Sequence, residues 1–98
     1  MTTALTLTTG SGPDGAAVLT AVGEIDMSNA ETFAEALNAA TADSDRLLVD
    51  LTAVEYLDSA GLAALFAQAE RIQVLTGPLL APLLEISGLA ELTSVRQA

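Results

Sequence analysis

The sequence predicts an α/β domain in which a mixed sheet of four to five short strands packs against three to four helices. Apolar residues make up 51% of the chain and aromatic residues only 3%, so Leu, Val, Ile and Ala must build the core. Such cores are typical of parallel or mixed sheets covered by helices. Strand-like and helix-like patterns also alternate along the chain, which favours this class. The length of 98 residues fits one domain, residues 1–98.

The first two strands are predicted to form a hairpin. Leucine and threonine alternate over residues 3–9, and a second β-favouring run covers residues 16–22. The segment between them, residues 10–15, is dense in glycine and other turn-forming residues. We therefore expect two adjacent antiparallel strands at the start of the sheet.

The first helix is predicted to begin at Ser28. Ser28 and Glu31 have the spacing of a capping box, in which the serine caps the helix and the glutamate reaches back to it. Apolar side chains then follow at i, i+3, i+4 and i+7, and this spacing places them on one helix face: Phe33, Ala36, Leu37 and Ala40.

A central strand is predicted before a second helix. Leu47, Leu48 and Val49 are apolar at consecutive positions, which indicates a strand covered on both faces. The segment after Ser59 has helical spacing, with an apolar side made of Leu62, Leu65, Phe66 and Ala69.

The back half of the chain leaves alternatives open. Either the second helix ends early and residues 72–76 form a short strand, or that strand is lost. A proline inside a helix removes a hydrogen bond, so the last helix is expected to begin near Pro82 or to be kinked there. Gly88 is expected to end that helix. Residues 90–98 are predicted as either an edge strand or a frayed end.

The charge of the chain excludes several partners. The net charge is −10, with no lysine and only three arginines, whereas binding of a phosphate backbone requires clustered cations. Nucleic acid and anionic membrane surfaces are therefore excluded as partners. A basic protein partner is compatible with this charge, and plain solubility is the alternative explanation.

The missing residue types narrow the chemistry further. The chain has no cysteine and no histidine, which excludes disulfides, thiol chemistry, a Ser-His-Asp triad and His/Cys zinc sites. No apolar run approaches the length of a membrane span, and the first residues lack the pattern of a signal peptide. We therefore expect a cytoplasmic protein that is not an enzyme, needs no cofactor or metal and does not insert into membranes.

The run from Tyr56 to Leu62 directly follows the predicted central strand and is the most informative segment. It places Ser59 where the strand turns into a helix, and backbone N–H groups are exposed at such a helix start. A phosphoryl group there would add about −1.5 to −2 charge and three acceptor oxygens. Ser59 is therefore a candidate phosphorylation site. The alternative is that Ser59 is simply the N-cap of the helix, since serine is among the best capping residues.

Three short blocks of the chain resemble the STAS-domain family, which includes the anti-sigma factor antagonists. The run from Tyr56 to Leu62 is similar to the family's phosphorylation loop. Gly-Glu-Ile-Asp at residues 23–26 resembles an earlier family block, and Glu-Ile-Ser-Gly-Leu at residues 85–89 resembles a late one. The resemblance implies a STAS-like fold. It also implies that Ser59 is phosphorylated by an anti-sigma factor that is itself a serine kinase-like ATPase.

By motif match, the resemblance also assigns Asp26 and Asp58 to the site, and we expect both on the sheet edge that carries Ser59. Gly61 either lets a kinase approach Ser59 or packs the helix closely on the sheet. Leu62 is either part of an apolar fringe or ordinary core. The predicted partner-binding residues are Asp26, Met27, Asp58, Ser59, Ala60, Gly61 and Leu62.

Two functions follow from the resemblance. In the first, the chain binds the anti-sigma factor when unphosphorylated and is released when Ser59 is phosphorylated. The partner would supply ATP and Mg²⁺, because this chain has no lysine and no Gly-x-x-x-x-Gly-Lys loop. In the second, the chain is a non-switching STAS subunit that binds and stabilises a transporter ATPase.

Overall fold

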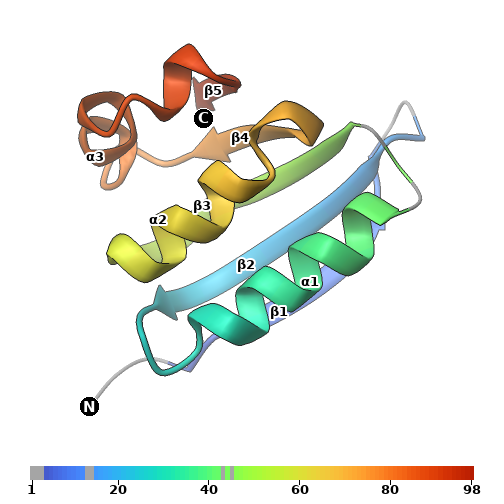
Figure 1. The fold of residues 1–98 in the computed structure, drawn as a ribbon, viewed down its shortest axis with the longest axis horizontal. Coiled ribbons are helices and arrows are strands. Elements are labelled where there is room, and N and C mark those ends of the chain that lie inside the picture. Colours follow the sequence, from blue (N-terminus) through green and yellow to red (C-terminus); the bar gives the residue numbers. More distant parts are fainter. Residues whose placement is uncertain (1–3, 13–14, 43, 45) are drawn as a thin grey trace.

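The computed structural model describes residues 4–12, 15–42, 44 and 46–98, and it confirms the α/β class with a mixed sheet. Within these residues one five-stranded sheet has the order β1-β2-β3-β4-β5 (Figure 1). β1 is antiparallel to β2, and the other neighbours are parallel. The strands are β1 (Thr6–Ser11), β2 (Ala17–Ile25), β3 (Leu47–Leu57), β4 (Ile72–Thr76) and β5 (Ser94–Gln97), and the helices are α1 (Ala30–Ala42), α2 (Ser59–Ala67) and α3 (Ala81–Ile86).

Helices cover one face of the sheet. Figure 1 shows α1 and α2 side by side in front of the strands, with α3 beside the β4–β5 end. The core between these layers is aliphatic apart from Phe33, as the composition predicts: the fully buried large side chains include Leu19, Ile25, Phe33, Leu37, Leu47, Leu51, Leu65 and Leu84.

The prediction that residues 47–49 are covered on both faces was wrong. Leu47 and Val49 are fully buried, but Leu48 between them is only half-buried. Alternate residues of a strand point to opposite faces, so Leu48 lies on the face away from the helices. Consecutive apolar residues here fill one covered face and part of an uncovered one.

The predicted hairpin is confirmed, because β1 and β2 pair antiparallel from Thr6 with Val22 to Ser11 with Ala17. The predicted start of the first helix was wrong. α1 begins at Ala30, and Ser28 donates both its backbone N–H and its hydroxyl to Asp26 instead of capping the helix. The Asp26 carboxylate, two residues upstream, accepts these hydrogen bonds, and so the Ser28 hydroxyl does not cap the helix. Aspartate commonly binds the backbone and side chains of nearby residues in this way.

The open alternatives of the back half are also resolved. A 3-10 turn at Ala69–Arg71 ends the second helical segment, and β4 then forms as the short strand. Pro82 lies in the first turn of α3, where its missing N–H costs nothing. Gly88 has a positive φ of 87° directly after the end of α3, as expected of a helix-ending glycine. The last residues form the edge strand β5.

The β2–β3 pair is irregular near the end that carries the candidate site. Its register shifts between Thr20 and Val22 and again between Gly23 and Glu24, and each time β3 contains one extra residue. Gly23, at the second irregularity, has φ 114°, a conformation that side-chain-bearing residues rarely adopt. These bulges set how β3 enters the loop before α2.

Candidate functional site

The candidate site lies at the carboxyl edge of the parallel strands. Ile25, the last residue of β2, pairs with Leu57, the last residue of β3. The backbone N–H of Asp58 then donates to the carbonyl of Ile25 at 3.1 Å. The loops that carry Asp26 and Asp58 therefore leave the sheet side by side, which confirms that both carboxylates lie at the edge that carries Ser59.

Asp58, and not Ser59, caps α2. One oxygen of the Asp58 carboxylate accepts hydrogen bonds from the backbone N–H of Ala60 at 3.0 Å and of Gly61 at 3.1 Å. Ser59 is already the first helical residue, and its side chain is exposed and makes no hydrogen bond to any residue that the structure describes. The capping alternative for Ser59 was therefore wrong. Its hydroxyl is presented to solvent on a rigid first turn.

The neighbouring loop holds its own serine differently. The Asp26 carboxylate accepts from the Ser28 hydroxyl at 2.5 Å and from the Ser28 N–H at 2.9 Å. These hydrogen bonds stabilise the ionised carboxylate and hold the pKa of Asp26 below its ordinary value. Asn29 fixes the loop further, because its side-chain amide donates to the Glu24 carbonyl and accepts from the Asp26 N–H.

Gly61 lies under the site and not on its surface. A Cβ added to Gly61 would lie 2.6 Å from Ile25 Cγ2 and 2.6 Å from Leu57 Cδ1. These contacts are closer than carbon atoms tolerate, so the structure supports the close-packing alternative for Gly61. Gly61 is buried and therefore offers little surface of its own, and its place among the partner-binding residues stays a prediction.

The remaining predicted contact residues differ in exposure. The Met27 side chain is 83% exposed and is one of several exposed large apolar side chains of the molecule. Ala60 is half-buried, and half-buried Leu62 packs against the core, so Leu62 offers only part of its side chain. Tyr56, 49% exposed, was not predicted as a site residue. The sequence does not reveal the exposure of Tyr56, because it does not show the register shifts between β2 and β3.

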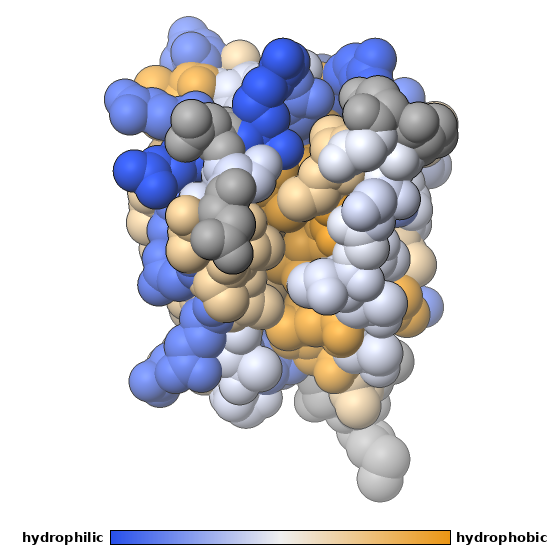
Figure 2. All heavy atoms as spheres, turned by 90° about the vertical axis from the view of Figure 1, so that its right-hand side faces the viewer, coloured by the Kyte–Doolittle hydropathy of each residue, from blue (hydrophilic) through white to orange (hydrophobic). Residues whose placement is uncertain are grey.

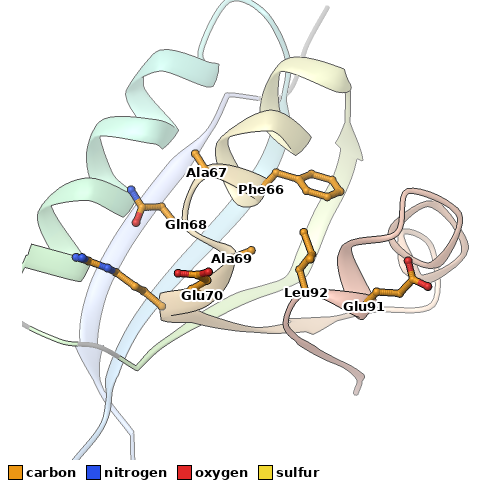
Figure 3. A pocket seen from close by; sticks show the side chains of 8 residues that line it. Phe66, Ala67, Gln68, Ala69, Glu70, Glu91 and Leu92 are labelled. Atoms are coloured by element: carbon orange, nitrogen blue, oxygen red, sulfur yellow. The ribbon is translucent and has the colours of Figure 1, made fainter.

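In the ranges that the structure describes, no group of three or more acidic side chains is arranged to hold a metal ion. A cleft of about 450 Å³ lies elsewhere, at the far end of α2, and contains none of the predicted site residues. Figure 3 shows the Leu92 side chain pointing toward the ring of Phe66. Ser59 itself is exposed at the start of α2.

Comparison with known proteins agrees with this geometry. The family model described as "Mlab, STAS domain" matches residues 9–95. The chain belongs to the STAS domain family. In Mycobacterium tuberculosis, the anti-sigma-F factor antagonist RsfB is 45% identical to this STAS domain over 60 residues, which are 60% of this chain and 49% of RsfB. The chain thus spans about half the length of the curated relatives it matches.

Two solved structures show how far the likeness of this STAS domain extends. An anti-sigma factor antagonist from Mycobacterium paratuberculosis superposes with a TM-score of 0.85 at 33% identity, over 95% of this chain and 86% of that one. The antagonist SpoIIAA in its unphosphorylated form superposes with a TM-score of 0.72 at 17% identity, over 95% of this chain and 88% of that one. At 17% identity, the likeness to SpoIIAA shows only that the two chains share a fold. In the described part of the chain, none of the helices has the length and hydropathy to cross a bilayer.

Proposed function

We propose that this STAS domain is an anti-sigma factor antagonist whose binding is switched off by phosphorylation of Ser59. The unphosphorylated form binds a kinase-type anti-sigma factor in the cytoplasm, and the phosphorylated form is released. The observation that carries the proposal is the exposed Ser59 hydroxyl, which stays unengaged because Asp58 caps the helix in its place.

The same capping bonds explain why a phosphoryl group would remain at the surface. The N–H groups of Ala60 and Gly61 already donate to Asp58, so they are not available to a phosphate on Ser59. None of the three arginines of the chain belongs to either loop of the site. Arg46 and Arg71 directly precede β3 and β4, so they lie at the amino ends of these strands, whereas the Ser59 loop follows the carboxyl end of β3. Arg96 lies within β5. A phosphate on Ser59 would add its charge to a region that already contains the carboxylates of Asp26 and Asp58.

This charge is sufficient for a switch without a backbone movement. The proposed interface consists of the exposed Met27 side chain, Ser59, Ala60 and part of Leu62, with Asp26 and Asp58 at its rim. A dianion placed in an interface without a compensating cation costs several kcal/mol, and each 1.4 kcal/mol changes the affinity about tenfold. The phosphoryl group itself would come from ATP bound by the partner, so this chain acts as a substrate and not as an enzyme.

A second candidate is the non-switching subunit that binds a transporter ATPase. One observation favours it: Asp58 and Asn29 fix both loops of the site by hydrogen bonds, and a rigid surface also suits a permanent contact. Under this alternative, Ser59 would be an ordinary contact residue.

The test compares wild-type protein with Ser59→Glu in pull-downs from the native lysate, with captured proteins identified by mass spectrometry. Ser28→Glu is the matched control, because it introduces the same charge in the adjacent loop. We expect a kinase-like anti-sigma factor to be captured by wild type and lost with Ser59→Glu. A transporter ATPase captured equally by both proteins would reject the switch and support the second candidate.

A further inference from the structure

The two outer strands of the sheet, β1 and β5, differ in how they are protected against pairing with a further strand. β5 at one edge is four residues long and contains the charged Arg96. β1 at the other edge is six residues long, pairs with β2 in a register without bulges, and contains no charged residue and no proline. Proteins usually protect an open edge with a short strand, a charge, a proline or a bulge, because unpaired backbone groups attract further strands. β5 has two of these protections and β1 has none.

A groove lies next to the unprotected edge. It has a volume of about 690 Å³, and the described residues that line it include no ionisable side chain. Leu7 and Thr9 of β1 line it together with Ala36, Ala39 and Ala40 of α1. Figure 2 views this side of the molecule and shows apolar side chains at the bottom of a hollow.

We infer that β1 is a homodimer interface, in which two copies of this chain pair their β1 strands antiparallel around a two-fold axis. The charge distribution selects a second copy as the occupant. Residues 4–12 carry no charge, so two acidic molecules can pair their β1 strands without opposing like charges along them. A basic partner would gain no charge complementarity from β1 itself. A two-fold axis also makes the contact self-complementary and closed, which prevents growth of a fibre.

The register of the pairing follows from the pleat. Directly opposed residues of an antiparallel pair point to the same face of the sheet. The two-fold axis must therefore pass midway between one residue and the same residue of the other copy, and the axis is named here after that residue. Axes at Thr8 and at Thr9 overlap equal lengths of β1, and the axis at Thr8 is favoured because it places Leu7 of one copy opposite Thr9 of the other. Both residues line the groove, so the side chains of each copy extend the apolar surface of the other. Thr8 itself is exposed and lies on the face away from the helices.

This dimer leaves the Ser59 loops accessible. β3 lies two strands away from β1, and the two-fold axis directs the carboxyl edges of the two copies to opposite ends of a continuous sheet. The inference is therefore independent of the function proposed for Ser59. A contact of one strand per copy falls at the small end of protein interfaces, so we expect association in the micromolar range.

The first test is sedimentation velocity on the purified full chain from low micromolar to near-millimolar concentration, with wild type, Thr8→Lys and Ser94→Lys. The two variants change the net charge equally, one at each sheet edge. We expect a monomer–dimer equilibrium that tightens with added salt, because salt screens the repulsion between two acidic molecules. Thr8→Lys places two like charges in direct opposition and should weaken dimerisation roughly tenfold or more, whereas Ser94→Lys should leave it unchanged.

The second test is oxidative cross-linking of Thr8→Cys, with Ser94→Cys as the control. The chain has no other cysteine, so a disulfide-linked dimer reports only the introduced thiols. Directly opposed positions in an antiparallel pair have the spacing that a disulfide requires. Efficient cross-linking of Thr8→Cys alone would support the dimer. A wild-type protein that stays monomeric at the highest concentration, a dimer unaffected by Thr8→Lys, or equal cross-linking of both cysteine variants would overturn it.

Discussion

The two loops that follow β2 and β3 contain the same residue types but hold their serines in opposite ways. In the first loop, Asp26 and Ser28 are separated by one residue, and the carboxylate accepts both the hydroxyl and the N–H of the serine. In the second, Asp58 and Ser59 are adjacent, and the carboxylate accepts two backbone N–H groups beyond the serine. Only the Ser59 hydroxyl remains unengaged. One residue of spacing thus decides which serine is available for chemistry.

The largest expected difference between the loops is in phosphorylation. We expect a kinase-type anti-sigma factor to modify Ser59 and not Ser28, because the Ser28 hydroxyl is held by Asp26. Incubation with the kinase and labelled ATP, followed by mass spectrometry of the peptides, should place the phosphate on Ser59. Ser59→Ala should abolish labelling, and Ser28→Ala should retain it. Labelling of Ser28 at a comparable rate would show that the hydrogen bond does not protect that serine.

The next effect concerns how tightly each loop is packed. Gly61→Ala should lower the free energy of unfolding by about 1–3 kcal/mol, because the new methyl group would contact Ile25 and Leu57 at 2.6 Å. Met27→Ala should change it by less than about 0.5 kcal/mol, since the Met27 side chain is mostly exposed. Urea unfolding followed by circular dichroism measures both. A tolerated Gly61→Ala would mean that α2 moves off the sheet easily.

A smaller effect separates the roles of Asp58 and Ser59. Asp58→Ala removes the N-cap of α2 and should cost about 0.5–2 kcal/mol of unfolding free energy. Ser59→Ala should cost little, because the serine has no hydrogen bond to lose within the described residues. Thermal and urea unfolding of the two variants under identical conditions would reveal the difference. Equal losses would restore Ser59 as a capping residue.

The smallest expected effect is a change in the pKa of Asp26. Its hydrogen bonds from Ser28 favour the ionised form, so the pKa of Asp26 should lie below the ordinary value of about 3.9. The stability that they contribute is present above the unfolded-state pKa and is lost as the pH falls through the folded-state pKa. NMR titration of the carboxyl carbons should show this low midpoint, and Ser28→Ala should raise it. An unchanged midpoint in Ser28→Ala would assign the shift to another cause.

Local patterns predicted much of the fold. The hairpin and the helix-ending role of Gly88 were predicted outright, whereas the strand after residue 71 and the helix start near Pro82 were each one of two alternatives that the sequence left open. All four depend on the backbone preferences of a few neighbouring residues. Such preferences act over short distances, so the sequence displays them. The site residues on the two loops were also found locally, through the three blocks that resemble the STAS family.

Competition between neighbours was harder to predict. Ser28 and Ser59 are both good capping residues by type, yet neither caps a helix, because Asp26 and Asp58 determine the hydrogen bonds in each loop. The exposure of Leu48 was also misjudged, since apolar composition does not reveal which face of a sheet the helices cover. These outcomes depend on differences of about 1 kcal/mol between alternative local hydrogen bonds, or on the packing of distant elements.

The sequence by itself determined the fold class, the excluded chemistries and the serine at the strand–helix junction, because each of these depends on residue types and short spacings. The tertiary structure decided three further things. Pairing of Ile25 with Leu57 brought two loops, more than 30 positions apart in the chain, to one edge. The close packing of α2 against those two residues buries Gly61 and leaves no room for a side chain there. The strand order left β1 unprotected beside a groove. These features require knowledge of which distant segments are neighbours, and only the folded chain supplies it.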